Sequence, residues 1–251
     1  MLRISLLLLL SLLQPKFLEK DIKELVTVSK DQSSVEAIHK DWDNLLKTYV
    51  DEQGNVDYLG FNKELQTLDR YLERLGNYSI DGNWSREKKL AYFINLYNAA
   101  TVKLILDNYP VESIKDINRP WAKAWIRQGG KLVSLGEIEH KILRKMDEPR
   151  IHFAINCASF SCPKLLNQAF TEDKLEQQLD LVTKDFINDT RRNIFSETKI
   201  ELSKIFKWYQ KDFENEGSLV AYLNQYSKSY INPDVKIDYL NYNWRLNEIK
   251  K

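Results

Sequence analysis

The sequence predicts an α+β protein, a predominantly helical single domain around a small β-sheet, with one very apolar central helix. Three observations lead to this prediction. Apolar residues recur at helical spacing through most of the chain. One stretch, residues 86–108, is apolar on nearly every side. Only short segments alternate like strands, and no repeat or linker divides residues 31–251, so we expect one domain there.

The first 20 residues have the composition of a signal peptide or an N-terminal anchor. A basic start, Met1 to Arg3, precedes an almost pure leucine run from Ile4 to Leu13. About ten apolar residues are too few to span a bilayer but suit the core of a signal peptide. We therefore expect an exported protein, periplasmic or extracellular, with no transmembrane helix in the mature chain.

Helices and strands follow from apolar spacing and from end signals such as Ser85, Ser134 and Pro110. His39 lies in the first helix without an evident partner and is expected to face solvent. The predicted helices cover about residues 31–50, 65–75, 86–108, 134–146, 171–188, 205–209 and 219–226, and the predicted strands 131–133, 199–202 and 236–240.

The helix at residues 86–108 carries two polar residues, Asn95 and Asn98, within its apolar surface. They are three positions apart and share a face, and a buried amide must find hydrogen-bond partners. Two interpretations stay open. The asparagines hold the backbone of a loop or another element, or they orient a histidine or bind substrate.

The helix at residues 134–146 places a carboxylate on its buried side. Glu139 falls within the apolar stripe of this helix, where an unpaired charge is costly. We expect Arg150 or His152 to be its partner. His140 falls outside the stripe, near Arg144, and by projection alone is a surface residue.

Both cysteines lie in residues 150–165, the stretch that carries the strongest chemical signal. Alternation predicts a strand from Ile151 to Cys157, with His152 and Asn156 on its polar face. Pro163 resembles the first residue of a helix. Cys162 would then lie at a helix start, where the dipole favours the thiolate.

The two cysteines also permit a plainer interpretation. Cys157 and Cys162 are five positions apart across a predicted loop, and a disulfide can close there if their Cα atoms lie within about 7 Å. In an oxidising compartment a structural bridge is a common outcome. A bridge, a functional thiol and two inert buried thiols all remain open.

Charge and motif content exclude several classes of function. The chain has 37 basic and 36 acidic residues and a formal net charge of +1, which does not suggest a nucleic-acid partner. It has no phosphate-binding glycine loop, no paired CxxC motif and no HExxH or GxSxG motif. We expect no cofactor and no metal site; the partner is an unidentified small molecule or peptide.

Five segments occur in order along the chain: 93–99, 135–144, 150–163, 202–209 and 242–247. Together they resemble the successive motifs of a known family, the "domain of unknown function 547" family, over about residues 41–247. That family includes many exported bacterial proteins. The resemblance raises His140 to a candidate; at the terminal motif, Asn243 and Arg245 replace the family's usual Asp and Ser. The resembling residues centre on Asn95, Asn98, Glu139, His140, Arg144, Arg150, His152, Asn156, Cys157, Ser161, Cys162 and Pro163.

Three hypotheses follow for the function. The first is a thiol-dependent hydrolase or acyl-transfer enzyme with Cys162 as nucleophile, His152 or His140 as base, and Glu139 or Asn95 as orienting group. The second is a non-catalytic binding module stapled by a Cys157–Cys162 bridge, and the third is a thiol–disulfide redox protein. The supporting residues would be Asn98, Arg144, Arg150, Asn156, Cys157 and Ser161.

Overall fold

The computed structural model describes residues 38–80, 82–215 and 217–249. Ile38–Lys251 form one compact unit. The predicted leader, residues 1–20, and the first residues of the predicted domain, 31–37, lie outside the described residues. In the described part of the chain, no helix is both long enough and apolar enough to cross a membrane.

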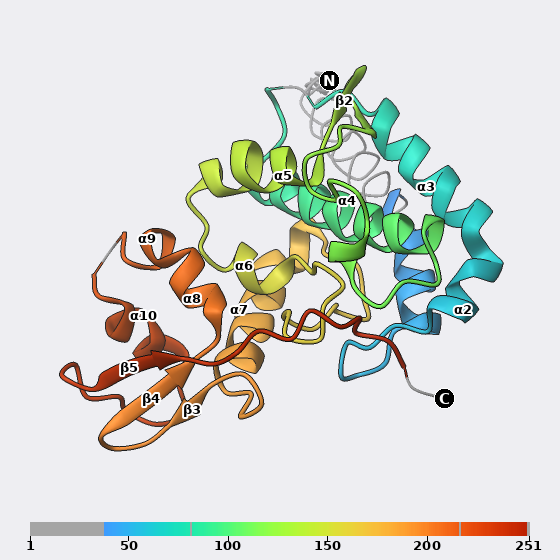
Figure 1. Ribbon diagram of the computed structural model, residues 1–251. Helices are drawn as coiled ribbons and strands as arrows, with labels where there is room; N and C mark the ends of the chain where they lie inside the picture. Colours follow the sequence, from blue (N-terminus) through green and yellow to red (C-terminus); the bar gives the residue numbers. More distant parts are fainter. Residues whose placement is uncertain (1–37, 81, 216, 250–251) are drawn as a thin grey trace, which may run out of the picture. The chain divides into compact units, whose positions relative to one another are not determined.

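The predicted α+β class, mostly helical, is confirmed (Figure 1). Residues 38–49 are helical. The α-helices that follow are α2 (Tyr58–Phe61), α3 (Leu65–Asn77), α4 (Arg86–Asp107), α5 (Leu135–Glu137), α6 (Ile151–Ala154), α7 (Leu175–Ile187), α8 (Lys204–Trp208), α9 (Gln210–Phe213) and α10 (Leu219–Tyr226). Short 3₁₀ turns are η1 (Asn62–Glu64), η2 (Ile114–Asp116), η4 (Leu143–Met146) and η5 (Glu172–Lys174), and η3 (Ile138–Ile142) is a π-helical turn.

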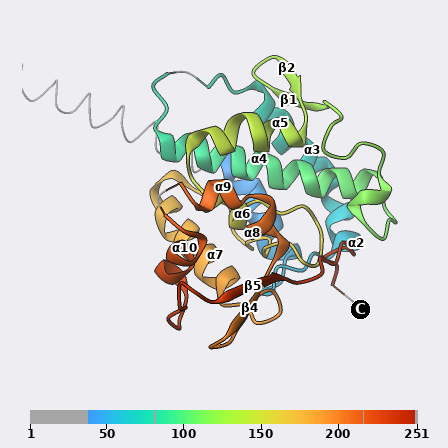
Figure 2. The same ribbon diagram turned by 60° about the vertical axis from the view of Figure 1, so that its left-hand side comes forward.

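Helix α4 lies between α5 and α6 in both views (Figures 1 and 2). Ser85 caps its start, where Ser85 Oγ accepts a hydrogen bond from the Lys88 N–H at 3.0 Å. Side chains on every side of the helix are buried, including Asn95 and Asn98. A helix that is apolar all round needs neighbours on all sides, and α3, α5 and α7 supply contacts to it.

Two small sheets complete the fold. Strands β1 (Ile126–Gln128) and β2 (Lys131–Val133) form an antiparallel hairpin around Gly129 and Gly130, which both have positive φ. The second sheet has the order β3-β4-β5: β3 (Ile194–Phe195) is antiparallel to β4 (Lys199–Leu202), and β4 is parallel to β5 (Lys236–Tyr239). This sheet lies beside α8 and α10 (Figure 1).

After β5, an extended segment runs back across the domain toward the C-terminus (Figure 1). Its backbone is hydrogen-bonded to loops far away in sequence. The Asn247 N–H donates to Ala158 O at 3.1 Å, and the Phe160 N–H donates to Arg245 O. These bonds place Tyr242 and Trp244 beside the loop that holds both cysteines.

His39 is buried, contrary to the expectation that it faces solvent. It is 3% exposed, and its Nδ1 lies 2.7 Å from the Tyr71 hydroxyl of α3. Burial lowers the pKa of His39 to about 4. A tyrosine on the neighbouring helix gives the neutral imidazole a partner, which the sequence of one helix alone does not reveal.

We predict that His39 makes the fold sensitive to mild acid. Because its folded-state pKa lies below 6.5, the unfolded chain takes up the proton first, so this stabilisation is present above pH 6.5 and is lost as the pH falls toward about 4. The loss amounts to about 3 kcal/mol. Urea unfolding at several pH values measures the free energy of unfolding. Between pH 6.5 and about 4, this free energy should fall less steeply in His39→Asn than in the wild-type protein. His140→Asn, at a half-exposed histidine, is the control; equal pH slopes in all three proteins would contradict the prediction.

Candidate functional site

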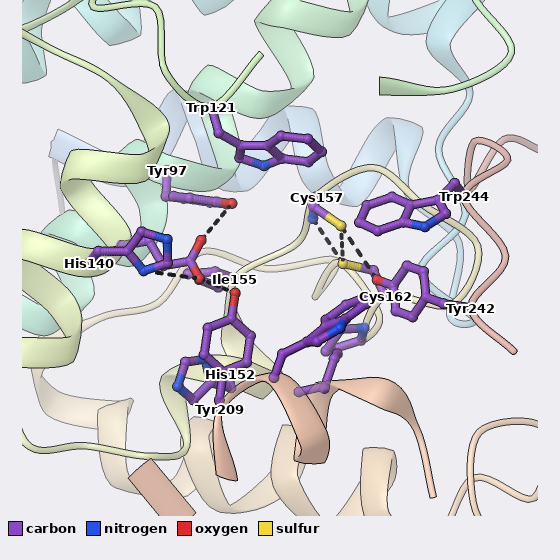
Figure 3. A pocket seen from close by; sticks show the side chains of 14 residues that line it. Tyr97, Trp121, His140, His152, Ile155, Cys157, Cys162, Tyr209, Tyr242 and Trp244 are labelled. Atoms are coloured by element: carbon purple, nitrogen blue, oxygen red, sulfur yellow. Dashed lines mark hydrogen bonds and ion pairs between the residues drawn. The ribbon is translucent and has the colours of Figure 1, made fainter. Parts of the chain in front are cut away.

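A pocket of about 350 Å³ opens between α4, the cysteine loop and the C-terminal segment (Figure 3). This volume is within the usual range for small-molecule sites. Cysteines, histidines and one carboxylate share the pocket with several aromatic rings. Its lining consists of Tyr97, Trp121, Glu139, His140, His152, Ile155, Cys157, Cys162, Pro163, Ile205, Trp208, Tyr209, Tyr242 and Trp244.

The segment before the cysteines is not the predicted strand. Ile151–Ala154 form one helical turn, α6, and the chain becomes extended only at Ile155. The turn begins at Glu148, whose carbonyl accepts the Ile151 N–H at 3.2 Å. All four residues of α6 are buried, so the alternation of polar and apolar types does not mark two faces. The polar members are instead satisfied by specific partners.

The predicted helix at Pro163 is also wrong. Residues 163–166 have no regular structure, and the loop is held by Asn156 instead. Asn156 Nδ2 donates to Pro163 O, and Asn156 Oδ1 accepts the Ala158 N–H, each at 2.7 Å. Ala158 has a φ of +59°. The loop therefore closes through one buried amide side chain, and neither a helix dipole nor helical N–H groups are available to Cys162.

Cys157 and Cys162 are free thiols whose sulfurs lie 2.8 Å apart. The disulfide permitted by the sequence is not formed in this structure. The environment of the two sulfurs is unequal, because the Cys157 N–H points at Cys162 Sγ at 3.0 Å. Cys157 Sγ lies instead beside two hydroxyls, Ser159 Oγ at 3.1 Å and Tyr242 Oη at 3.5 Å.

This asymmetry separates the acidities of the two thiols. Burial alone raises the pKa of Cys162, but hydrogen bonds from the thiol and the N–H of Cys157 outweigh it and lower the pKa from 9.0 to about 7. The hydrogen bond to Cys162, followed by burial, raises the pKa of Cys157 well above its usual value. Cys162 is therefore the more acidic thiol of the pair.

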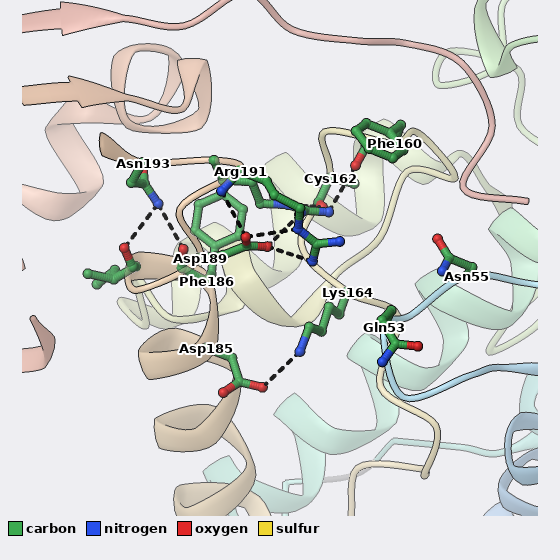
Figure 4. Close-up of polar contacts among 12 residues, drawn as sticks. Gln53, Asn55, Phe160, Cys162, Lys164, Asp185, Phe186, Asp189, Arg191 and Asn193 are labelled. Carbon is green, nitrogen blue, oxygen red and sulfur yellow. Dashed lines mark hydrogen bonds and ion pairs between the residues drawn. The ribbon is translucent and has the colours of Figure 1, made fainter. Parts of the chain in front are cut away.

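A buried arginine supports the cysteine loop from outside the pocket. Arg192 Nε donates to Cys162 O and Arg192 Nη2 donates to Phe160 O, each at 2.9 Å. Asp189 pairs with the same guanidinium at 2.6 Å, and Figure 4 shows this carboxylate beside the loop. The guanidinium also adds positive charge near Cys162, in the direction that favours a thiolate.

Glu139 forms the opposite side of the pocket. Its carboxylate accepts hydrogen bonds from the hydroxyls of Tyr97, at 3.3 Å, and Tyr209. Its side chain is 7% exposed, and His140 Nδ1 lies 3.8 Å away. The burial predicted for Glu139 is found, but its expected partners, Arg150 or His152, are wrong: Glu139 lies in the π turn η3, which aims it at two tyrosines.

His152 is bonded to a carboxylate that the sequence analysis missed. His152 Nε2 lies 2.8 Å from Asp212 Oδ2, and its ring stacks on Tyr209 with centroids 3.9 Å apart. Burial lowers the pKa of His152 against the effect of Asp212, so the imidazole is neutral and Nε2–H is the donor. Asp212 also accepts two hydrogen bonds from Arg144, at 2.6 and 2.8 Å.

Arg150 lies outside the pocket and ties α6 to α7. Its guanidinium pairs with Glu148, Glu176 and Asp180 at 2.7 to 3.0 Å. Ser161 fixes the C-terminal segment, because its Oγ accepts the Asn243 N–H at 2.9 Å. Both residues support the site without lining it.

Asn95 and Asn98 hold backbone, as the first of the two sequence interpretations proposed. Asn95 brackets Phe170, donating to its carbonyl at 2.7 Å and accepting its N–H at 3.0 Å. Asn98 donates to Ala154 O at 2.9 Å and accepts the Asn156 N–H at 2.8 Å. Neither amide bonds a histidine, so Asn95 does not serve as the orienting group of a Cys/His site.

The aromatic lining was not predicted as a site. Trp121, Trp208, Tyr242 and Trp244 come from three separate segments. The sequence placed Trp208 in a predicted helix and Trp121 in a connection at helical spacing with Trp125, and neither was marked as part of a site. Trp208 and Trp244 stack with centroids 5.7 Å apart, and Trp121 meets Trp244 edge-on at 5.8 Å. The signal was the Tyr242–Trp244 motif itself, whose aromatic residues would be unusual in a loop unless they packed or bound something.

The fold and the site define a helical α+β domain with a thiol pair at an aromatic pocket. A family model described as "Protein of unknown function, DUF547" matches residues 82–187, which supports the family resemblance seen in the sequence. The matched residues include both cysteines, Glu139 and His152. Neither the curated proteins nor the solved structures contain a match to the chain. Among the described residues, no group of three or more His, Cys, Asp or Glu is placed to hold a metal ion.

We predict that Cys162 is the faster-reacting thiol and titrates near neutral pH. Iodoacetamide alkylation of the reduced protein, followed by peptide mass spectrometry, should label Cys162 with a half-maximal rate near pH 7. Cys162→Ser should leave only slow labelling at Cys157, which rises at much higher pH. Preferential labelling of Cys157 at pH 7 would contradict this assignment.

We predict that Asn98→Ala destabilises the protein by about 2 to 4 kcal/mol, because it leaves the Ala154 carbonyl and the Asn156 N–H buried without partners. Chemical unfolding measures this loss. Asn108→Ala, at the C-cap of the same helix, is the control: Asn108 Nδ2 donates to Leu104 O at a part-buried position, and losing this hydrogen bond should cost less than about 1 kcal/mol. Similar losses in the two variants would overturn the assignment of Asn98 as a clamp.

Proposed function

We propose that the protein is a thiol–disulfide oxidoreductase whose active pair is Cys157 and Cys162. The single observation that carries the proposal is the contact of the two sulfurs in the wall of a ligand-sized pocket. A nucleophilic thiolate beside a resolving thiol is what a two-step exchange requires. The leucine run predicts export, and in an oxidising compartment such a pair can form its disulfide.

Thiol–disulfide exchange at this pair takes place in two steps. Cys162 thiolate attacks one sulfur of a disulfide RSSR, the S–S bond breaks, and one RS⁻ leaves with a mixed disulfide remaining on Cys162. Cys157 then gives up its proton to the second RS group as its sulfur attacks Cys162 Sγ and expels RSH. Two electrons pass from the dithiol to RSSR, and the enzyme is left with a Cys157–Cys162 bridge. A small dithiol reductant closes the cycle.

Ser159 and Tyr242 are suited to assist the second step. Cys157 must lose a proton to become the attacking sulfur, and its Sγ lies within reach of both hydroxyls. Ser159 Oγ and Tyr242 Oη are themselves 2.9 Å apart. Together they can stabilise the Cys157 thiolate as it forms.

We predict a mixed disulfide in Cys157→Ser. With glutathione disulfide, the wild-type protein should form an internal bridge, whereas Cys157→Ser should accumulate glutathione on Cys162, because no thiol resolves it. Cys162→Ser should react about 50-fold more slowly at pH 7, since its remaining thiol is almost fully protonated. Intact-mass spectrometry after acid quenching identifies each species.

Two outcomes would overturn the redox proposal. If the wild-type thiols do not bridge across the glutathione redox range, the pair does not cycle. If a bridge forms that glutathione cannot reduce, it is a structural staple, and a stapled binding module is the better description.

A thiol hydrolase is the second candidate, favoured by the lowered pKa of Cys162 in a pocket that also contains His140 and His152. The geometry supports it less well, because His152 Nε2 faces Asp212 and no histidine is hydrogen-bonded to Cys162 Sγ, whose partners in the described chain are the thiol and the N–H of Cys157. Cys157→Ser separates the two candidates. A hydrolase retains thioester turnover with Cys162 alone, whereas a dithiol oxidoreductase stops after one mixed disulfide.

A further inference from the structure

The charges around the pocket are unbalanced. Among its 14 lining residues, Glu139 is the one carboxylate and none is lysine or arginine. Cys162, with a pKa of about 7, adds part of a second negative charge at neutral pH, and burial lowers the pKa of His152. Two arginines near the pocket, Arg144 and Arg192, lie outside its lining and pair with Asp212 and Asp189. The charge of the lining itself is negative, which favours a cationic ligand over an anionic one.

No lysine or arginine of the described chain forms an ion pair with the buried Glu139: its hydrogen-bond partners are hydroxyls, and the nearby Arg144 pairs with Asp212 instead. Across the described chain, the half-exposed His140 is the one basic side chain within 4 Å of it. Tyr97 and Tyr209 donate hydrogen bonds to it and so suit its ionised form. A buried carboxylate is normally paired with a cation, and a ligand ammonium can fill that role.

The rings around the pocket are a second, independent feature that favours a cation. Aromatic faces attract ammonium groups, and several rings together form the cages that bind them. Two rings of the lining already carry such a contact from residues outside it: Lys115 Nζ lies 5.3 Å from the Trp244 centroid, and Arg144 Cζ lies 5.3 Å from the Tyr209 centroid. Trp208, at 45% exposure, offers a further ring at the pocket opening.

The two sides of the pocket match the two ends of a short ligand. Tyr97, His140 and Tyr209, which surround Glu139, lie on one side in Figure 3, and Cys157 and Cys162 lie on the other. Trp121 lies along the space between them. We propose that the substrates are small disulfides and thiols bearing an ammonium group, with the ammonium at Glu139 and the rings and the sulfur at Cys162. This inference rests on the proposed thiol–disulfide exchange.

Three disulfides of similar size test the inference: cystamine with two ammonium groups, neutral hydroxyethyl disulfide, and dithiodiglycolate with two carboxylates. Each rate with the protein at neutral pH is divided by its rate with a free reference thiol, which removes intrinsic reactivity. We expect cystamine to exceed hydroxyethyl disulfide by about tenfold, and dithiodiglycolate to react slowest.

Matched variants then identify the groups responsible. Glu139→Gln should reduce the normalised preference for cystamine to near unity, and Glu139→Asp should restore part of it. Glu73→Gln, at an exposed carboxylate of α3, controls for general charge and should keep the tenfold preference. Trp208→Leu should weaken the preference, whereas Trp208→Phe, which retains a ring, should preserve most of it.

The outcomes separate this inference from the proposed function. If all three disulfides exchange at Cys162 with equal normalised rates, the ammonium specificity is wrong and the oxidoreductase stands. If none exchanges faster than with Cys162→Ser, the oxidoreductase is wrong. Calorimetric titration of the Cys162→Ser protein with cystamine then still tests the ammonium site: about tenfold weaker binding in the added Glu139→Gln background supports it, and equal binding overturns it.

Discussion

The geometry of the site depends on the clamp that Asn98 makes from α4. The Asn98 side chain donates a hydrogen bond to the carbonyl of Ala154, the last residue of α6, and accepts one from the N–H of Asn156, the residue before Cys157. Both backbone groups are buried where α6 ends, and a helix end without partners is costly. One side chain on the buried helix therefore sets where the cysteine loop begins.

The loop that follows has almost no backbone ladder of its own. Asn156 closes its start, Arg192 holds two of its carbonyls, and the C-terminal segment pairs with it through Ala158 and Phe160. A segment held by side chains can take a shape that neither helix nor strand permits. Here that shape, with Ala158 at positive φ, turns the Cys157 N–H toward Cys162 Sγ. This N–H contact adds to the hydrogen bond from the Cys157 thiol in lowering the pKa of Cys162.

Much of the fold was predictable because apolar residues recur along its elements at the spacing of a helix or a strand. Arg86–Asp107, Lys131–Val133 and Lys199–Leu202 lie where the sequence predicted them. The burial of Glu139 also followed from helical projection. The strand predicted from Ile151 failed because residues 151–154 are buried on all sides, and alternation carries no information in that situation. Pro163 failed as a helix start because Asn156 takes its carbonyl.

The partners across the site could not be predicted, since they come from segments distant in the chain. Asp212 is 60 positions from His152, and Tyr209 is 70 positions from Glu139. Periodicity describes one element at a time. It predicted that Glu139 is buried, but it offered Arg150 or His152 as the partner of this carboxylate. The structure gives Glu139 and His152 separate partners on or beside α9. Keeping His152 with Asp212 leaves Glu139 without a full counter-ion, and that separation is what makes the pocket negative beside a thiolate.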